Sequence, residues 1–255
     1  MINQKVIEEL DQYGFYIFDD VLPEERCEDL ARELDKIVEE QKAKGLTKYI
    51  NDMYKHVWNL PYKSDKFLSL VDHPKALPYL EHYLGEDMIL SSFNARHPVA
   101  GQRLHSDSRL HCESKTPLYD QTFQLTVIYV LDDFLPETGS TRIIPGSNHW
   151  GGIPQEGKDY KGLIQVTVPR GSLILLKSHV WHSHTENTAG RRRWAIIGYY
   201  SMWFIKQNFD FTRNYPKDLI KKATPKQLQL LGFHSIPPTD EFEREHTKTS
   251  YPVFS

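Results

Sequence analysis

The chain lacks the features of a disulfide-stabilised or membrane-bound protein. It has two cysteines among 255 residues, Cys27 and Cys112, too few for a disulfide framework. Cys27 falls on the apolar stripe of an expected helix, so we predict a buried thiol there. No apolar stretch reaches the ~18 residues of a membrane span, and the first residues are polar, unlike a secretory signal. We therefore expect a cytoplasmic protein without a membrane partner.

A dominant charge of either sign is also missing. The formal net charge is -3, and the basic residues form no block longer than Arg191-Arg192-Arg193. Proteins that bind nucleic acid usually carry a basic patch or stripe, so we expect no nucleic-acid partner. The composition does not distinguish a monomer from a homodimer, and both are kept as expectations.

The length and the 39% of hydrophobic residues suit one sizeable domain over residues 1–255. A mostly helical part is expected up to about residue 85, and a helical or irregular part over 205–255. Between about 88 and 204, short apolar runs alternate with turn residues such as Pro145-Gly146-Ser147. The runs cover 88–93, 122–131, 142–144, 163–168, 172–177 and 193–203. This pattern predicts a mainly β fold with flanking helices, built on a double-stranded β-helix of the jelly-roll, cupin-like kind.

His105-Ser-Asp107 is the most informative motif. Residues i and i+2 of a strand point to the same side, so one imidazole and one carboxylate could meet one ion. His182, from a distant strand, would complete a set of two histidines and one carboxylate. Such a set holds Fe(II) and leaves positions open for O2 and a co-substrate. We therefore predict a non-heme iron oxygenase.

Arg193 is the expected anchor for a dicarboxylate. Its charge is permanent, and its guanidinium can hold a carboxylate through two parallel hydrogen bonds. His182 ends an expected strand and Arg193 begins the next, so antiparallel pairing would bring them together. His184 has the same strand parity as His182 and is the alternative ligand.

These motifs together resemble the phytanoyl-CoA dioxygenase superfamily of Fe(II)/2-oxoglutarate oxygenases. The resemblance covers roughly residues 10–204 and leaves out the last 50 residues. It rests on the strand and helix over Gly14 to Leu34, His105 and Asp107, Gly139 to Pro145-Gly146-Ser147 with Asn148 before His149, and His182 followed by Asn187 and Arg193.

The resemblance implies roles for individual residues. His105, Asp107 and His182 would hold iron, and Arg193 would bind the distal carboxylate of 2-oxoglutarate. The family's spacing from its distal histidine to Asn187 and Arg193 favours His182 over His184. Other co-substrate contacts would come from Gln102, Thr126 and Asn94, which we expect at the end of a strand. Where some relatives have a hydroxyl residue two positions after the arginine, this chain has Ala195, so another donor must serve.

The reaction implied is hydroxylation of an unactivated C–H bond by O2, with 2-oxoglutarate converted to succinate and CO2. The family's halogenases have a small residue in place of the carboxylate ligand, so Asp107 argues against halogenation. The substrate would be a small molecule, and an amino acid, a polar metabolite and a natural-product intermediate all stay open. Arg109, for an anionic group, and His111 and Trp203 are the substrate-contact candidates, and His149 could also line the pocket.

Two other classes fit part of the pattern. A cupin-like metal enzyme that does not use 2-oxoglutarate would keep His105, Asp107 and His182 without needing Arg193. A catalytically degenerate jelly roll that only binds a ligand would fail to bind iron.

Overall fold

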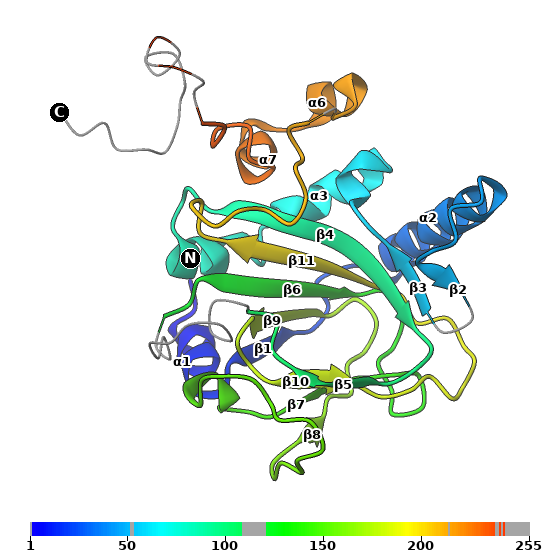
Figure 1. The fold of residues 1–255 in the computed structure, drawn as a ribbon, viewed down its shortest axis with the longest axis vertical. Coiled ribbons are helices and arrows are strands. Elements are labelled where there is room, and N and C mark those ends of the chain that lie inside the picture. The colour runs from blue at the N-terminus through cyan, green and yellow to red at the C-terminus, as the bar shows by residue number, and fades with distance from the viewer. Residues whose placement is uncertain are drawn as a thin grey trace.

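Two antiparallel sheets face each other in the computed structural model, which describes residues 2–51, 54–108, 121–213, 215–237, 240 and 242. Helices cover the outer face of the larger sheet, and the smaller sheet lies across from its inner face (Figure 1). This is the jelly-roll arrangement that the short, turn-separated strands predict.

The larger sheet has seven strands. Their order is β1 (Phe15–Phe18), β9 (Leu173–Lys177), β6 (Gln124–Val130), β11 (Ala195–Ser201), β4 (Ile89–Pro98), β3 (Tyr54–Val57) and β2 (Ile50–Asn51). The smaller sheet has four strands, in the order β5 (Gln102–His105), β10 (His182–His184), β7 (Thr141–Ile143) and β8 (Ile164–Gln165).

The helices lie mostly before β4 and after β11. They are α1 (Gln4–Tyr13), α2 (Glu24–Ala43), α3 (Leu68–Val71), α4 (Leu77–Leu84), α6 (Lys217–Lys222) and α7 (Pro225–Leu230), with 3-10 turns η1 (Leu60–Tyr62), η2 (Asp65–Phe67) and η3 (Ser147–His149). Their ends follow the sequence signals: Gly14 caps α1 in the left-handed conformation, and Thr224 begins α7 with a capping box. None of the helices in the described ranges is long and apolar enough to cross a membrane.

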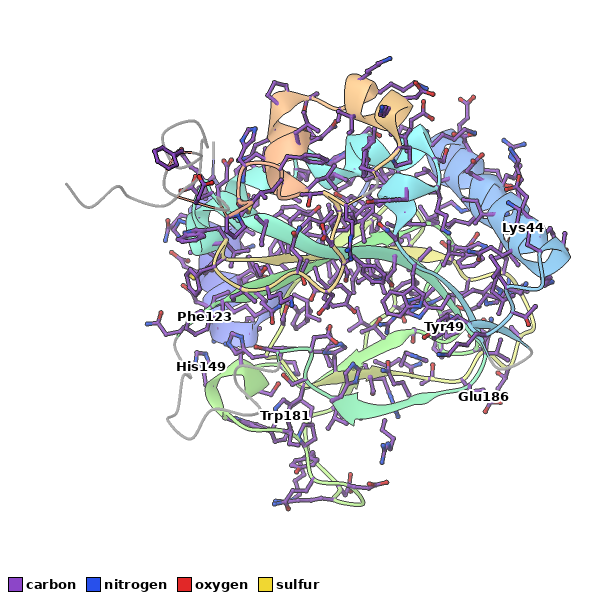
Figure 2. The ribbon with its side chains drawn as sticks, turned by 45° about the horizontal axis from the view of Figure 1, so that its top comes forward. Lys44, Tyr49, Phe123, His149, Trp181 and Glu186 are labelled. Carbon is purple, nitrogen blue, oxygen red and sulfur yellow. The ribbon has the colours of Figure 1, made fainter. Side chains whose placement is uncertain are left out.

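Strand alternation explains the two hydrophobic clusters. On β6, Leu125, Val127 and Tyr129 belong to the cluster under the helices, whereas Ile128 and Val130 belong to the cluster between the sheets. Both faces of this strand are therefore buried, which is why its sequence is almost continuously apolar. Side chains of both sheets project into the space between them (Figure 2).

The structure corrects three expectations about strands. β4 runs to Pro98 instead of ending near Phe93, so Asn94 lies within a strand. The run 163–168 gives only the two-residue strand β8 and one isolated bridge, Phe134 to Val168. The strand expected just after Gly14 is present as β1, but the mostly helical first 85 residues also contribute β2 and β3 to the larger sheet, which were not expected.

A further correction concerns His182 and Arg193, which we expected on paired strands. β10 pairs with β5 and β7, whereas β11 pairs with β4 and β6, so the segment between them crosses from one sheet to the other. The two residues therefore approach each other across the space between the sheets. A short turn-rich connection is compatible with either arrangement, and only the long-range pairing of the strands distinguishes them.

Candidate active site

His105 and His182 lie directly opposite each other on the neighbouring strands β5 and β10. Residues paired in this way point to the same face, and their ring centroids are 4.3 Å apart. Asp107 follows β5 by two residues and directs its carboxylate between the rings. Its Oδ1 lies 3.4 Å from His105 Nε2 and its Oδ2 lies 3.4 Å from His182 Nε2.

Backbone carbonyls orient both imidazole rings. His105 Nδ1 lies 3.0 Å from the carbonyl of Arg103, and His182 Nδ1 lies 3.0 Å from the carbonyl of Val180. With the Nδ1 proton donated to a carbonyl, each neutral ring leaves Nε2 free as a metal ligand.

The three groups also influence one another's charge. Burial would raise the pKa of Asp107, but the two imidazoles hold it well below its usual range, so the carboxylate is ionised. Burial would lower the pKa of His182, but the Asp107 carboxylate outweighs this effect and raises it. Without a metal, the ring of His182 therefore holds its proton more firmly than an ordinary histidine does.

The Asp107 loop is tied to the segment that leads into β10. The amides of Asp107 and Ser108 both donate to the carbonyl of Ser178, at 2.9 and 3.0 Å. The Ser178 hydroxyl pairs with that of Thr126 at 3.0 Å. These bonds connect the loop after β5, the approach to β10 and the inner face of β6.

The Pro145-Gly146-Ser147 turn supports the approach to His182 instead of forming part of the site. Ser147 Oγ donates to the carbonyl of Ile144 and accepts from the amide of Trp181, at 2.7 and 2.8 Å. The turn thereby fixes the residue just before His182. The expectation that His149 lines the pocket is wrong, because this exposed ring contacts the carbonyl of Asp11 at 2.8 Å.

Arg193 enters the space between the sheets from the start of β11. It is only 4% exposed, and its guanidinium carbon lies 3.5 Å from the centre of the Phe134 ring. Its Nε is buried without a hydrogen-bond partner. Burial, together with the nearby Arg96 and despite Asp132, lowers the pKa of Arg193 to about 9, so it stays charged at neutral pH. A buried cation of this kind fits an anionic ligand.

The neighbouring residues direct Arg193 inward. Arg192 turns outward and binds Asp132 and Glu28, and the amide of Trp194 donates to Asp132 at 2.8 Å. Asn187 Nδ2 donates to the carbonyl of Arg191 at 2.8 Å and closes the preceding turn.

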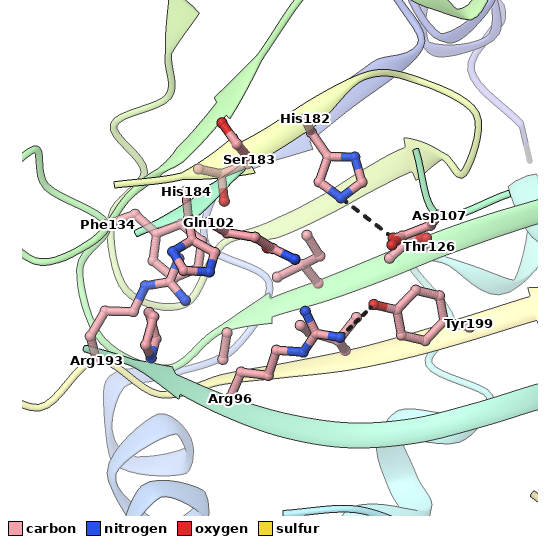
Figure 3. A pocket seen from close by; sticks show the side chains of 15 residues that line it. Arg96, Gln102, Asp107, Thr126, Phe134, His182, Ser183, His184, Arg193 and Tyr199 are labelled. Atoms are coloured by element: carbon pink, nitrogen blue, oxygen red, sulfur yellow. Dashed lines mark hydrogen bonds and ion pairs between the residues drawn. The ribbon is translucent and has the colours of Figure 1, made fainter. Parts of the chain in front are cut away.

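A cavity connects Arg193 with the histidine–aspartate cluster (Figure 3). Of the residues proposed from sequence, Asp107, His182, Arg193, Gln102 and Thr126 line it, whereas His105 lines a neighbouring groove that shares Gln102 with the cavity. The cavity is also lined by residues that sequence reasoning did not select as co-substrate contacts, namely Arg96, Thr141, Phe134 and Tyr199. Thr141 is a hydroxyl donor that could serve where Ala195 offers none.

The other candidates are placed as follows. Asn94 is buried on the inner face of β4, where its Oδ1 accepts from His56 at 2.9 Å and its Nδ2 has no partner. His184 lines the cavity outside the metal-binding cluster and contacts the carbonyl of Thr185. Trp203 lies beyond β11 against Phe204, away from the cavity lining. Arg109 and His111 lie outside the described residues.

The donor set fits a divalent metal ion. One ligand atom from each of His105, Asp107 and His182 lies within 4.8 Å of the others, and no other such group of three occurs among the described residues. Two neutral imidazoles and one carboxylate on one side of an ion suit ferrous iron. The Arg193 guanidinium, whose buried Nε has no hydrogen-bond partner, lies at the far end of the cavity and suits the second carboxylate of a chelating dicarboxylate.

Comparisons with known proteins agree with this geometry. The sequence profile of the phytanoyl-CoA dioxygenase (PhyH) family matches residues 10–195. "Dioxygenase af480" of Aspergillus fumigatus is 26% identical over 187 residues, which cover 71% of this chain and 59% of that protein.

Two solved structures share the fold. HygX from Streptomyces hygroscopicus, with nickel and 2-oxoglutarate bound, is 15% identical and superimposes with a TM-score of 0.66, covering 81% of this chain and 90% of HygX. EctD from S. alaskensis with bound Fe is 16% identical and has a TM-score of 0.65, covering 79% of this chain and 77% of EctD.

Proposed function

Because the chain belongs to the phytanoyl-CoA dioxygenase (PhyH) family, we propose that it is an Fe(II)/2-oxoglutarate-dependent oxygenase that hydroxylates a small molecule at an unactivated C–H bond. The class of non-heme iron, 2-oxoglutarate oxygenase follows from the family, from relatives named dioxygenase and from the His105–Asp107–His182 cluster. The observation that carries the proposal is the buried Arg193 at the opposite end of one cavity from this cluster.

In this function, His105, Asp107 and His182 hold the metal through two Nε2 atoms and one carboxylate. Their carbonyl partners fix the ring orientations before metal binds. When bound, iron supplies the chemistry that activates O2 with electrons from the oxidation of 2-oxoglutarate to succinate and CO2.

Arg193 binds the distal carboxylate of 2-oxoglutarate, and the hydroxyls of Thr126 and Thr141 and the amide of Gln102 are the other polar groups available in the cavity. Apolar side chains between these groups, including Ile128 and Ile197, limit access of water to the co-substrate. The carboxylate of Asp107 occupies the ligand position that halogenases leave open, which supports hydroxylation.

An anaerobic titration of metal-free protein with Fe(II) and then 2-oxoglutarate tests the function. We expect the visible charge-transfer band of an iron-bound keto acid. His182→Ala should abolish the band, and Arg193→Gln should raise the 2-oxoglutarate dissociation constant tenfold or more. The loss of one charge-assisted pair at a buried cation accounts for this size of effect.

Two results would contradict the proposal in different ways. Iron binding without the band would favour a metal enzyme that does not use 2-oxoglutarate. No iron binding at all would favour a binding protein with a degenerate site.

A further inference from the structure

A second arginine faces the same cavity. Arg96 lies on β4 opposite Ala195, and its guanidinium lies between Arg193 and Tyr199 (Figure 3). Its Nη2 donates to the Tyr199 hydroxyl at 3.4 Å, and its Nε is buried without a partner. Within the described part of the chain, no carboxylate lies at ion-pair distance from Arg96. A half-buried cation without a counter-ion is a site for an anionic group.

The proposed cofactor and co-substrate do not satisfy this charge. Among the described residues that line the cavity, Asp107 is the single carboxylate, whereas Arg96 and Arg193 are both cations. A divalent iron would add two positive charges and 2-oxoglutarate two negative ones. The assembled site would then keep one excess positive charge, which one further carboxylate would neutralise.

Arg96 also lies between the cavity and an outer groove. Arg96, Pro98, Gln102 and His184 line both spaces. On the outer side, the rings of His56 and Trp58 stack with centroids 3.8 Å apart. Burial, together with the charge of Arg96, lowers the pKa of His56 to about 3, so this ring is neutral and the stacked pair forms an uncharged, flat wall.

The groove continues past Trp58 to Tyr49 and Phe209. Figure 2 shows Tyr49 at the β2–β3 end of the larger sheet. Lysines also line this stretch, including Lys55 and Lys63, and none of its described lining residues is acidic. The surface thus combines aromatic rings with positive charge, although the whole chain has a net charge of -3.

We propose that the primary substrate is a carboxylate with a flat apolar body, that Arg96 binds its carboxylate, and that the His56–Trp58 stack holds its body. Arg96 thereby selects the substrate, whereas Arg193 binds the co-substrate. The inference rests on the proposed function, because it assigns a substrate carboxylate to the positive charge that remains once iron and 2-oxoglutarate are bound.

Paired probes test the role of Arg96. Benzoate, phenylacetate, 3-phenylpropionate and 4-phenylbutyrate are each compared with their primary amides by calorimetric titration, with metal-free protein and with protein loaded with Ni(II) and 2-oxoglutarate. We expect at least one carboxylate to bind tenfold or more tightly than its amide. Arg96→Gln should reduce this difference to twofold or less, and Arg96→Lys should keep part of it. Trp58→Ala should weaken the carboxylate and the amide equally.

Arg103→Gln is the matched control, since it removes an exposed cationic side chain that pairs with Glu156 outside the groove and keeps the backbone carbonyl that orients His105. The 2-oxoglutarate dissociation constant, read from the charge-transfer band, should change less than threefold in Arg96→Gln. The inference is overturned if no carboxylate of the series binds, if the amides bind equally well, or if Arg96→Gln weakens 2-oxoglutarate as much as Arg193→Gln does. Failure of the proposed function is seen separately, as absence of the band in the wild-type protein.

Discussion

At the scale of single residues, the cavity depends on which side chains the strands point inward. Thr126 and Ile128 face it because they alternate along β6 with residues of the helix-covered face. The pairing of β5 with β10 makes His105 and His182 neighbours, and the loop after β5 brings Asp107 to both rings. The protonation states of Asp107 and His182 are coupled, since the charge on each stabilises the charged form of the other.

We predict that metal binding strengthens as the pH rises. The pKa of His182 lies above the usual 6.5, so a metal has to displace a proton from it up to a higher pH than from an ordinary histidine. Lowering the pH protonates more of the sites, and the affinity for Ni(II) should fall by up to about tenfold per pH unit for each displaced proton. Calorimetry between pH 6 and 8.5 measures this effect. An affinity that does not change over this range would contradict the assigned ligands.

Gly198 gives a second prediction at this scale. A Cβ at this position would lie 2.8 Å from Tyr200 Cε2 and 2.9 Å from Phe93 Cε2, both in the packed core. Gly198→Ala should therefore destabilise the protein by about 1–3 kcal/mol, measured by urea denaturation. The double variant Gly198→Ala with Phe93→Leu should lose less free energy of unfolding than the sum of the losses of the two single variants, because the smaller leucine makes room for the new methyl group. Strict additivity would show that the ring of Phe93 is not the obstacle.

At the scale of elements, an ion-pair network attaches α2 to the start of β11. Arg192 contacts both oxygens of Asp132 at 3.1 Å and pairs with Glu28 of α2. Trp194 adds a bond from its indole nitrogen to Asp35 of the same helix, at 2.8 Å. The helix thereby helps to direct Arg193, the next residue after Arg192, into the cavity.

We predict that Arg192→Ala lowers the free energy of unfolding by about 2 kcal/mol or more, because it leaves Asp132 largely buried without its main cation. Arg191→Ala is the matched control. Its pair with Glu137 spans 3.3 Å between side chains that are 62% and 50% exposed, so its loss should change stability by less than about 1 kcal/mol. If the two variants lose the same free energy of unfolding in thermal or urea denaturation, the Arg192 network stabilises the protein no more than an exposed ion pair does.

Some elements of the fold could be predicted from the sequence, and others could not. The short apolar runs and the turn residues between them were enough to predict β6, β9 and β11, because the length of a run and its flanking turns are local information. The spacing of His105 and Asp107 predicted that the two would share a site, although β5 ends at His105 and Asp107 lies beyond it, and His182 was selected by its spacing to Asn187 and Arg193. Arg96 was not foreseen, since β4 continues past the apolar run that signals it, and its role depends on pairing with β11. Thr141 was likewise missed, because only the register of β7 against β10 brings it to the cavity.

At the scale of the whole molecule, the His105–Asp107–His182 cluster connects two segments of the smaller sheet that are far apart in the sequence. The cavity lies between the two sheets. A ligand that spans His182 and Arg193 therefore contacts both layers of the fold. Binding to the folded state alone stabilises it by about 2.7 kcal/mol when the ligand is at 100 times its dissociation constant.

We predict that Ni(II) and 2-oxoglutarate together raise the melting temperature by about 5–10 °C at such concentrations. Ni(II) alone should give a smaller shift, and 2-oxoglutarate alone almost none, because its chelating end needs the metal. His182→Ala should remove the combined shift. A shift that persists in this variant would place the ligands elsewhere on the molecule.

The pairing of His105 with His182 also has a consequence for synthesis of the protein. A chain emerging from the ribosome carries His105 and Asp107 for 75 residues before His182 is made. In the larger sheet, β1 likewise pairs with β9, a strand that is made much later. A nascent chain that stops before His182 therefore cannot capture the ion. Binding of an ion through all three groups therefore has to wait until β10 has been made.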